Sequence, residues 1–103
     1  MAMNEEDTRK KGEIEALVKQ CGGVYEEWFV GVTDDVAKKL FGDHQVVETP
    51  GVNSYITRRA SSNEAARAIA KHFLDQGADG SLGRLLTDMD MVYAYRKKDN
   101  TRP

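Results

Sequence analysis

Apolar side chains recur along this chain with two different periods, and the periods predict alternating helices and strands. Residues 12–21 show the three- and four-residue spacing of one helix face, and Gly22-Gly23 would end that helix. The residues of this stripe are Ile14, Leu17, Val18 and Cys21. Apolar side chains alternate in residues 24–33, which predicts a strand. Both faces of that strand are largely apolar near its middle, so we expect it to be central and covered on both sides.

The segment after this strand predicts a short helix and a second strand. Thr33-Asp34-Asp35 supplies the capping oxygens and negative charge that favour a helix start. The helix is expected over residues 35–41, with Gly42 as its end. Pro50-Gly51 indicates a turn, and residues 54–59 are expected to form the second strand.

The last third of the pattern predicts one more helix and one more strand. Ser61 with Glu64 forms a possible capping box, and Ser62 is an alternative cap. The helix after them has the clearest apolar stripe, consisting of Ala66, Ile69, Ala70, Phe73 and Leu74, and Gly77 would close it. Residues 78–90 lack periodicity and are expected to be a long loop. Residues 91–97 are expected to form the third strand, with Met91, Tyr93 and Tyr95 on one face.

These elements predict an α/β fold in the order α-β-α-β-α-β, although an α+β arrangement is also possible. We expect a small three-stranded sheet with helices packed on it. With so few strands, an edge could remain unpaired and serve for self-association or for a protein partner.

A chain of 103 residues is expected to form one domain. We expect a flexible, charged lead-in over residues 1–11, the domain over residues 12–97 and a mobile tail over residues 98–103. The single cysteine, Cys21, permits no internal disulfide, and the apolar runs are too short to span a membrane. The start of the chain lacks the apolar core of a signal peptide, so a cytoplasmic location without membrane contact is expected.

The net charge of −2 argues against strong binding of nucleic acid, but the charge is unevenly distributed. Residues 1–48 hold six Lys/Arg and eleven Asp/Glu, whereas residues 49–103 hold nine Lys/Arg and six Asp/Glu. The basic second half could carry a modest phosphate-binding patch. A mixed, solvated surface would produce the same counts.

The residues that commonly carry out catalysis form no recognisable set. His44 is expected to satisfy the final carbonyls of the second helix, and His72 to pack beside the third. Asp34-Asp35 is first of all a helix cap. The spacing predicts no catalytic residue, no metal site and no cofactor. The candidate nucleic-acid contacts are Lys38, Lys39, Arg58 and Arg59.

The segment Trp28–His44, with the sequence WFVGVTDDVAKKLFGDH, resembles the second half of the GIY-YIG nuclease motif. Phe29-Val30-Gly31 stands at the YIG position, and Lys38-Lys39 stands where the family usually has a basic pair. Thr33 and Asp35 fit the turn, and His44 lies near the expected histidine. The resemblance implies a metal-assisted DNA-cleaving fold that uses a tyrosine, an arginine and a glutamate.

The catalytic residues implied by the resemblance are mostly missing. Phe29 has no hydroxyl, Lys39 lacks the planar fork of arginine, and Ala70 occupies the natural place of the glutamate. The sequence therefore predicts a domain that is not an enzyme and that binds DNA, RNA or a nucleic-acid-associated protein. The alternatives are a protein-interaction or homodimerisation module and, second, a metal-dependent GIY-YIG-like endonuclease.

Overall fold

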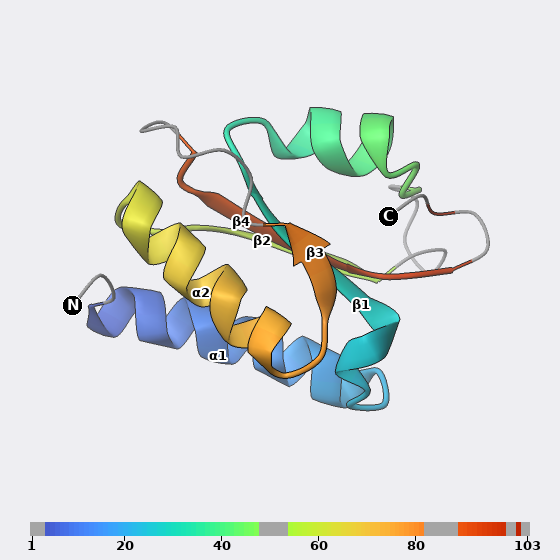
Figure 1. Cartoon of the computed structure of the whole chain (residues 1–103), viewed down its shortest axis with the longest axis horizontal. Coiled ribbons are helices and arrows are strands. Elements are labelled where there is room, and N and C mark those ends of the chain that lie inside the picture. Colours follow the sequence, from blue (N-terminus) through green and yellow to red (C-terminus); the bar gives the residue numbers. More distant parts are fainter. Residues whose placement is uncertain (1–3, 48–53, 82–88, 99–100, 102–103) are drawn as a thin grey trace.

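The computed structural model describes residues 4–47, 54–81, 89–98 and 101, and within them it shows a mixed α/β fold (Figure 1). The helical elements are α1 (Glu5–Gln20), the 3-10 turn η1 (Tyr25–Glu27), the π-helix η2 (Lys38–Asp43) and α2 (Asn63–Asp75). The strands are β1 (Trp28–Thr33), β2 (Tyr55–Arg59), β3 (Asp79–Ser81) and β4 (Met91–Arg96). The α/β class is confirmed, but the sheet formed by these described residues has four strands, so the predicted three-stranded sheet and element order are wrong.

The strands form one sheet in the order β2-β4-β1-β3. β4 runs antiparallel to both β1 and β2, while β3 runs parallel to β1. All six residues of β1 are buried, which confirms the prediction of a central, covered strand. The strand begins only at Trp28, because residues 25–27 form the 3-10 turn η1.

Helices cover both faces of the sheet, and each face has its own apolar cluster. Figure 1 shows α1 and α2 on one side of the sheet and η2, in green, on the other. The larger cluster lies on the side of α1 and α2 and includes Ile14, Trp28, Val30, Ile69 and Phe73. The smaller cluster lies on the side of η2 and consists of Phe29, Leu40, Val46, Tyr93 and Tyr95, with Val36, Phe41 and Tyr55 packed against it.

Helix α1 begins at Glu5, well before the start that the apolar spacing predicted. Asn4 and Asp7 form a reciprocal capping box, and the acidic first turn suits the positive end of the helix dipole. Residues 5–11, which the sequence analysis assigned to a flexible lead-in, are therefore helical. The apolar pattern missed this turn because its buried residue, Asp7, is charged. At the other terminus, Thr101 is buried and its hydroxyl donates to the carbonyl of Lys98.

The two serines that precede helix α2 make different contacts. Ser62 is the N-cap, since its hydroxyl accepts a hydrogen bond from the Ala65 amide at 3.0 Å. Ser61 instead binds Asp7 of α1 through both its amide and its hydroxyl. Gly77 follows the end of the helix with φ of 114°, the left-handed conformation that favours glycine. The predicted end of this helix is confirmed.

Strand β3 lies in the segment that the sequence analysis assigned to a long loop. It pairs with β1 over three residues, with Gly80 opposite Val30. A methyl group on Gly80 would overlap the Val30 carbonyl oxygen, so the close approach of these two backbones requires glycine. A three-residue strand containing glycine has too few side chains to show alternation, which is why its sequence gave no strand signal. Residues 82–88 of the predicted loop lie outside the described residues.

Candidate functional site

The helix that follows β1 is capped as the sequence predicted but ends differently. The Asp35 carboxylate accepts a hydrogen bond from the Lys38 amide at 3.1 Å, and the Thr33 hydroxyl accepts one from the Asp35 amide. The His44 amide donates to the Lys39 carbonyl at 2.8 Å, a five-residue step that widens the helix into a π-helix. The predicted end at Gly42 is wrong. The helix continues to Asp43, and Gln45 turns the chain with φ of 59°.

The wide turn directs the His44 side chain into the sheet, where it lies between two tyrosines of β4. The Nε2 atom lies 2.9 Å from the Tyr93 hydroxyl, and Nδ1 lies 3.0 Å from the Tyr95 hydroxyl. The imidazole also packs on the ring of Phe29, with 4.6 Å between ring centroids. His44 was expected to satisfy helix carbonyls with its side chain. It instead joins η2 to the sheet through what we call the Tyr-His-Tyr network, which consists of Tyr93, His44 and Tyr95.

Gly31 provides the space that this network needs. Tyr93 lies opposite Gly31 in the ladder between β1 and β4. A methyl group on Gly31 would overlap the ring and hydroxyl of Tyr93. The absence of a side chain on Gly31 thus lets the tyrosine ring cross β1 and reach His44.

The hydroxyls of the network stay protonated near neutral pH. Burial, together with the negative charge of Asp43, raises the pKa of Tyr93 to about 12. Burial, with Tyr93 and Asp79 nearby, raises the pKa of Tyr95 still further. A general base works best when its pKa lies near the operating pH, so these tyrosines are poorly suited to activate water. All three side chains of the network are also buried, which keeps them from a ligand at the surface.

The four predicted basic contacts do not share one surface. Lys38 is exposed on η2, and Lys39 beside it pairs with Asp43 at 3.4 Å. Arg58 lies on the opposite face of the sheet, where it pairs with Glu13 of α1 at 3.0 Å. Because successive side chains of a strand point to opposite faces, the side chain of Arg59 lies on the side of the sheet that η2 covers. Lys39 and Arg58 therefore lie on opposite faces of the sheet.

Arg59 lies near the end of β2 and is only loosely paired. Its Nε atom is 3.9 Å from a carboxylate oxygen of Asp90 and 3.3 Å from the sulfur of Met91. The side chain is mostly exposed. Of the four predicted residues, Lys38, Lys39 and Arg59 thus remain on the side of the sheet that η2 covers.

Two residues that stand at missing catalytic positions of the nuclease motif have packing roles instead. Phe29 is part of the smaller apolar cluster, and Ala70 of α2 is buried in the larger one. Tyr25 lies in η1 and packs on Phe73, far along the chain from the Tyr-His-Tyr network. The hydroxyls near His44 come from Tyr93 and Tyr95 instead. The Tyr-x-Tyr alternation was visible in the sequence, but nothing in it indicated that β4 would pair with β1.

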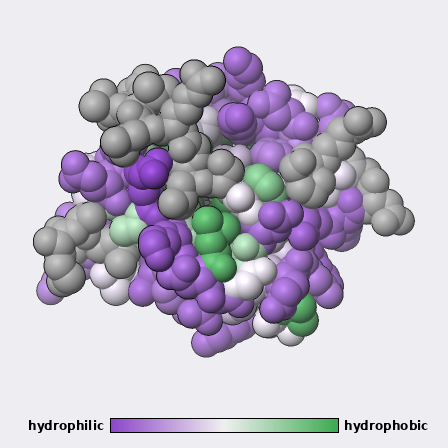
Figure 2. Space-filling view, in the orientation of Figure 1, coloured by the Kyte–Doolittle hydropathy of each residue, from purple (hydrophilic) through white to green (hydrophobic). Residues whose placement is uncertain are grey.

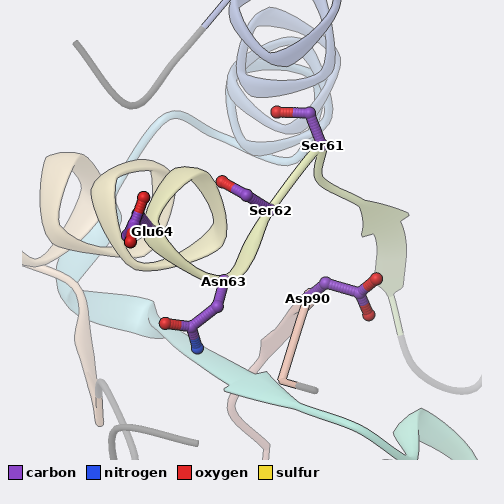
Figure 3. Close-up of a pocket in the computed structure, with 5 residues that line it drawn as sticks. All are labelled: Ser61, Ser62, Asn63, Glu64 and Asp90. Carbon is purple, nitrogen blue, oxygen red and sulfur yellow. The ribbon is translucent and has the colours of Figure 1, made fainter. Parts of the chain in front are cut away.

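A shallow pocket of about 360 Å³ lies at the start of α2. Figure 3 shows its lining residues, which are Ser61, Ser62, Asn63, Glu64 and Asp90. Three of its polar lining residues already have partners, since Ser61 binds Asp7, Ser62 caps α2 and the Asn63 side-chain amide donates to the Met89 carbonyl. Its two carboxylates would repel a phosphate. This pocket is therefore a poor candidate for the predicted nucleic-acid contact.

Among the described residues, no three metal-binding side chains lie together, and no helix there has the length and apolar character needed to cross a membrane. No protein-family model matches the chain, and neither the curated proteins nor the solved structures contain a significant match.

Proposed function

We propose that this chain is a small, non-catalytic cytoplasmic domain that binds nucleic acid, or a protein associated with it, through the outer surface of η2. One observation carries the proposal. The groups with catalytic chemistry, Tyr93, His44 and Tyr95, are buried and joined by hydrogen bonds, whereas Lys38 and Lys39 of η2 face outward. The Tyr-His-Tyr network holds η2 against the sheet, and the lysines of η2 lie on its outer side.

The ion pairs on this side of the sheet are weak enough to exchange for phosphate. The pair between Lys39 and Asp43 is 3.4 Å long, and both side chains are more than two-fifths exposed. Exposed pairs of this kind contribute only about 0–1 kcal/mol. A phosphate oxygen could therefore replace the carboxylate at little cost. Arg59 could extend the contact along the same side of the sheet, whereas Arg58 lies on the other face, beside Glu13.

The test is a fluorescence-anisotropy titration with labelled duplex DNA, single-stranded DNA and RNA at low ionic strength. We expect weak binding that falls steeply between about 50 and about 200 mM salt, because each phosphate contact releases counterions. The variant Lys38→Glu/Lys39→Glu should abolish it. Lys71→Glu, which changes an exposed lysine of α2 paired with Asp75, is the control and should bind nearly as well as wild type. Absence of binding to all three probes at low salt would exclude nucleic acid as the ligand.

A protein partner is the second candidate, and the acidic residues around the lysines favour it. Asp34, Asp35 and Asp43 flank Lys38 and Lys39, so the outer surface of η2 carries charges of both signs. The face of the molecule seen in Figure 2 is mainly hydrophilic, with hydrophobic residues in small separate patches. A partner captured by wild type and lost by Lys38→Glu/Lys39→Glu, together with no binding of nucleic acid, would favour this candidate.

The resemblance to GIY-YIG nucleases keeps a metal-dependent endonuclease as a third candidate. Against it stand the missing hydroxyl at Phe29 and the raised pKa of Tyr93. A cleavage assay with Mg²⁺ or Mn²⁺ on duplex DNA tests it. We expect no cleavage. Cleavage that Lys39→Ala reduced would revive the enzyme hypothesis and contradict a purely binding role.

A further inference from the structure

Strand β2 lies at the edge of the sheet, and its hydrogen-bond pattern shows which backbone groups face outward. The Arg96 amide donates to the Ser54 carbonyl at 2.9 Å, and the Ala60 amide donates to the Asp90 carbonyl at 2.8 Å. Bonded residues alternate along an antiparallel ladder. Residues 54, 56, 58 and 60 therefore face β4, and the backbone groups of Tyr55, Thr57 and Arg59 point away from it.

Two of the three outward carbonyls are covered by cationic side chains. The Thr57 carbonyl accepts a hydrogen bond from Nη1 of Arg58 at 2.7 Å. The Arg59 carbonyl accepts one from Nζ of Lys10, a residue of α1, at 2.6 Å. Arg58 is in turn held by Glu13, one turn further along α1. Helix α1 thus places Lys10 beside the outer edge of β2 and holds Arg58 there through Glu13.

We infer that Lys10 and Arg58 protect the β2 edge against pairing with a second copy of the chain. An added strand needs the outward carbonyls as acceptors as well as the outward amides as donors. With two carbonyls occupied, an antiparallel β2–β2 contact would form only if both cations left their positions. Two copies would also bring four of these positive charges close together, and lysine at an edge is a known protection against strand pairing.

Arg58, one of the four predicted nucleic-acid contacts, has a structural role at this edge. Its guanidinium is used on the Thr57 carbonyl and on Glu13, so its charge serves the edge of the sheet. The inference is independent of the proposed function, because Lys38 and Lys39 lie on the other face.

The test compares self-association of Lys10→Ala/Arg58→Ala with that of wild type by sedimentation over a concentration series. We expect the variant to associate at a concentration at least tenfold lower. Arg9→Ala/Lys71→Ala is the matched control, because it removes the same charge from two exposed helical residues that also have acidic partners. It should behave as wild type. In amide exchange, Thr57 should be unprotected in wild type and become protected in the associated variant.

Three results would overturn the inference. The first is a folded double variant that associates no more than wild type, and the second is equal association of the matched control. The third is a Thr57 amide that is already protected in wild type, since it would show that the edge is paired. Should the double variant not fold, Lys10→Ala alone exposes the Arg59 carbonyl. That variant must then associate at a lower concentration than wild type, or the inference fails.

Discussion

The ring of Tyr93 lies across Gly31, and a methyl group on this glycine would overlap the ring and the hydroxyl. The two residues are paired in the ladder between the central strands β1 and β4. Their contact lets the Tyr93 hydroxyl reach His44, which attaches η2 to the sheet. The glycine that gave the segment its nuclease-like appearance therefore has a clear packing role in this fold.

Replacing Gly31 with alanine should destabilise the protein by about 1–3 kcal/mol, since the added methyl group overpacks a buried contact. Urea unfolding followed by the fluorescence of Trp28, the single and buried tryptophan, measures this change. Gly42→Ala is the control, because a methyl group there meets nothing within 4 Å and alanine favours helix. Gly31→Ala being as stable as Gly42→Ala would refute the packing role.

The Tyr-His-Tyr network makes a prediction about coupling. His44→Phe keeps an aromatic ring but leaves the buried hydroxyls of Tyr93 and Tyr95 without their shared partner, which should cost about 2–4 kcal/mol. Adding Tyr93→Phe and Tyr95→Phe removes those hydroxyls, and the triple variant should regain much of the loss. Unfolding free energies of the single, double and triple variants test this. Strictly additive losses would mean that the hydrogen bonds to His44 contribute nothing measurable.

The raised pKa of the tyrosines predicts loss of stability in alkali. Tyr93 has a pKa of about 12 in the folded chain against an ordinary value of 10.0, so the unfolded chain releases this proton first. The resulting stability is fully present below about pH 10 and is lost as the pH rises towards 12. Melting temperatures over this range should fall for wild type and fall less for Tyr93→Phe. If the melting temperatures of both proteins fell equally with pH, the burial of the Tyr93 hydroxyl would be contradicted.

The contact between Asp7 and Ser61 predicts loss of stability in acid. Burial alone would raise the pKa of Asp7. Hydrogen bonds from Ser61 and Asn4 and the charge of Lys10 together lower the pKa by more than burial raises it, so the pKa lies below its ordinary value of 3.8. The carboxylate therefore stabilises the fold above about pH 4, and this stability is lost as the pH falls through the folded pKa.

Asp7→Asn should cost about 1–3 kcal/mol at neutral pH, because the amide cannot accept from all of the donors that face Asp7. It should also flatten the pH dependence of the unfolding free energy below about pH 4. Glu6→Gln, an exposed neighbour in the same turn, is the control. An acid profile unchanged by Asp7→Asn would show that the carboxylate is not the group responsible.

Side-chain periodicity predicted the parts of the fold that bury regular stripes. The alternation in β1 agrees with the positions of Phe29 and Val30 on opposite faces of the sheet. The predicted stripe of α2 included four of its buried residues, but it missed the buried Ala65 and included the half-buried Leu74. The first turn of α1 was missed because a buried aspartate holds it in place. β3 was missed because its pairing depends on Gly80 approaching a distant backbone.

The candidate site was harder to predict because it depends on contacts between segments far apart in the sequence. His44 and Tyr93 are 49 residues apart, and only the pairing of β1 with β4 brings them together. Similarly, Arg58 and Arg59 are adjacent in the sequence, but their side chains point to opposite faces of the sheet because side chains alternate along a strand. The two lysines of η2 could be predicted as outward-facing, because they lie on the polar side of a short amphipathic helix.

The most direct measurement of the central proposal is a titration of the ¹⁵N-labelled protein with a short nucleic acid, followed by amide chemical shifts at low salt. We expect the largest shifts at Lys38, Lys39 and Arg59, and little change at Lys71 of α2. Addition of salt should reverse these shifts. Shifts centred on α1 or α2, or no shifts with DNA and RNA alike, would contradict the proposal that η2 presents the binding surface.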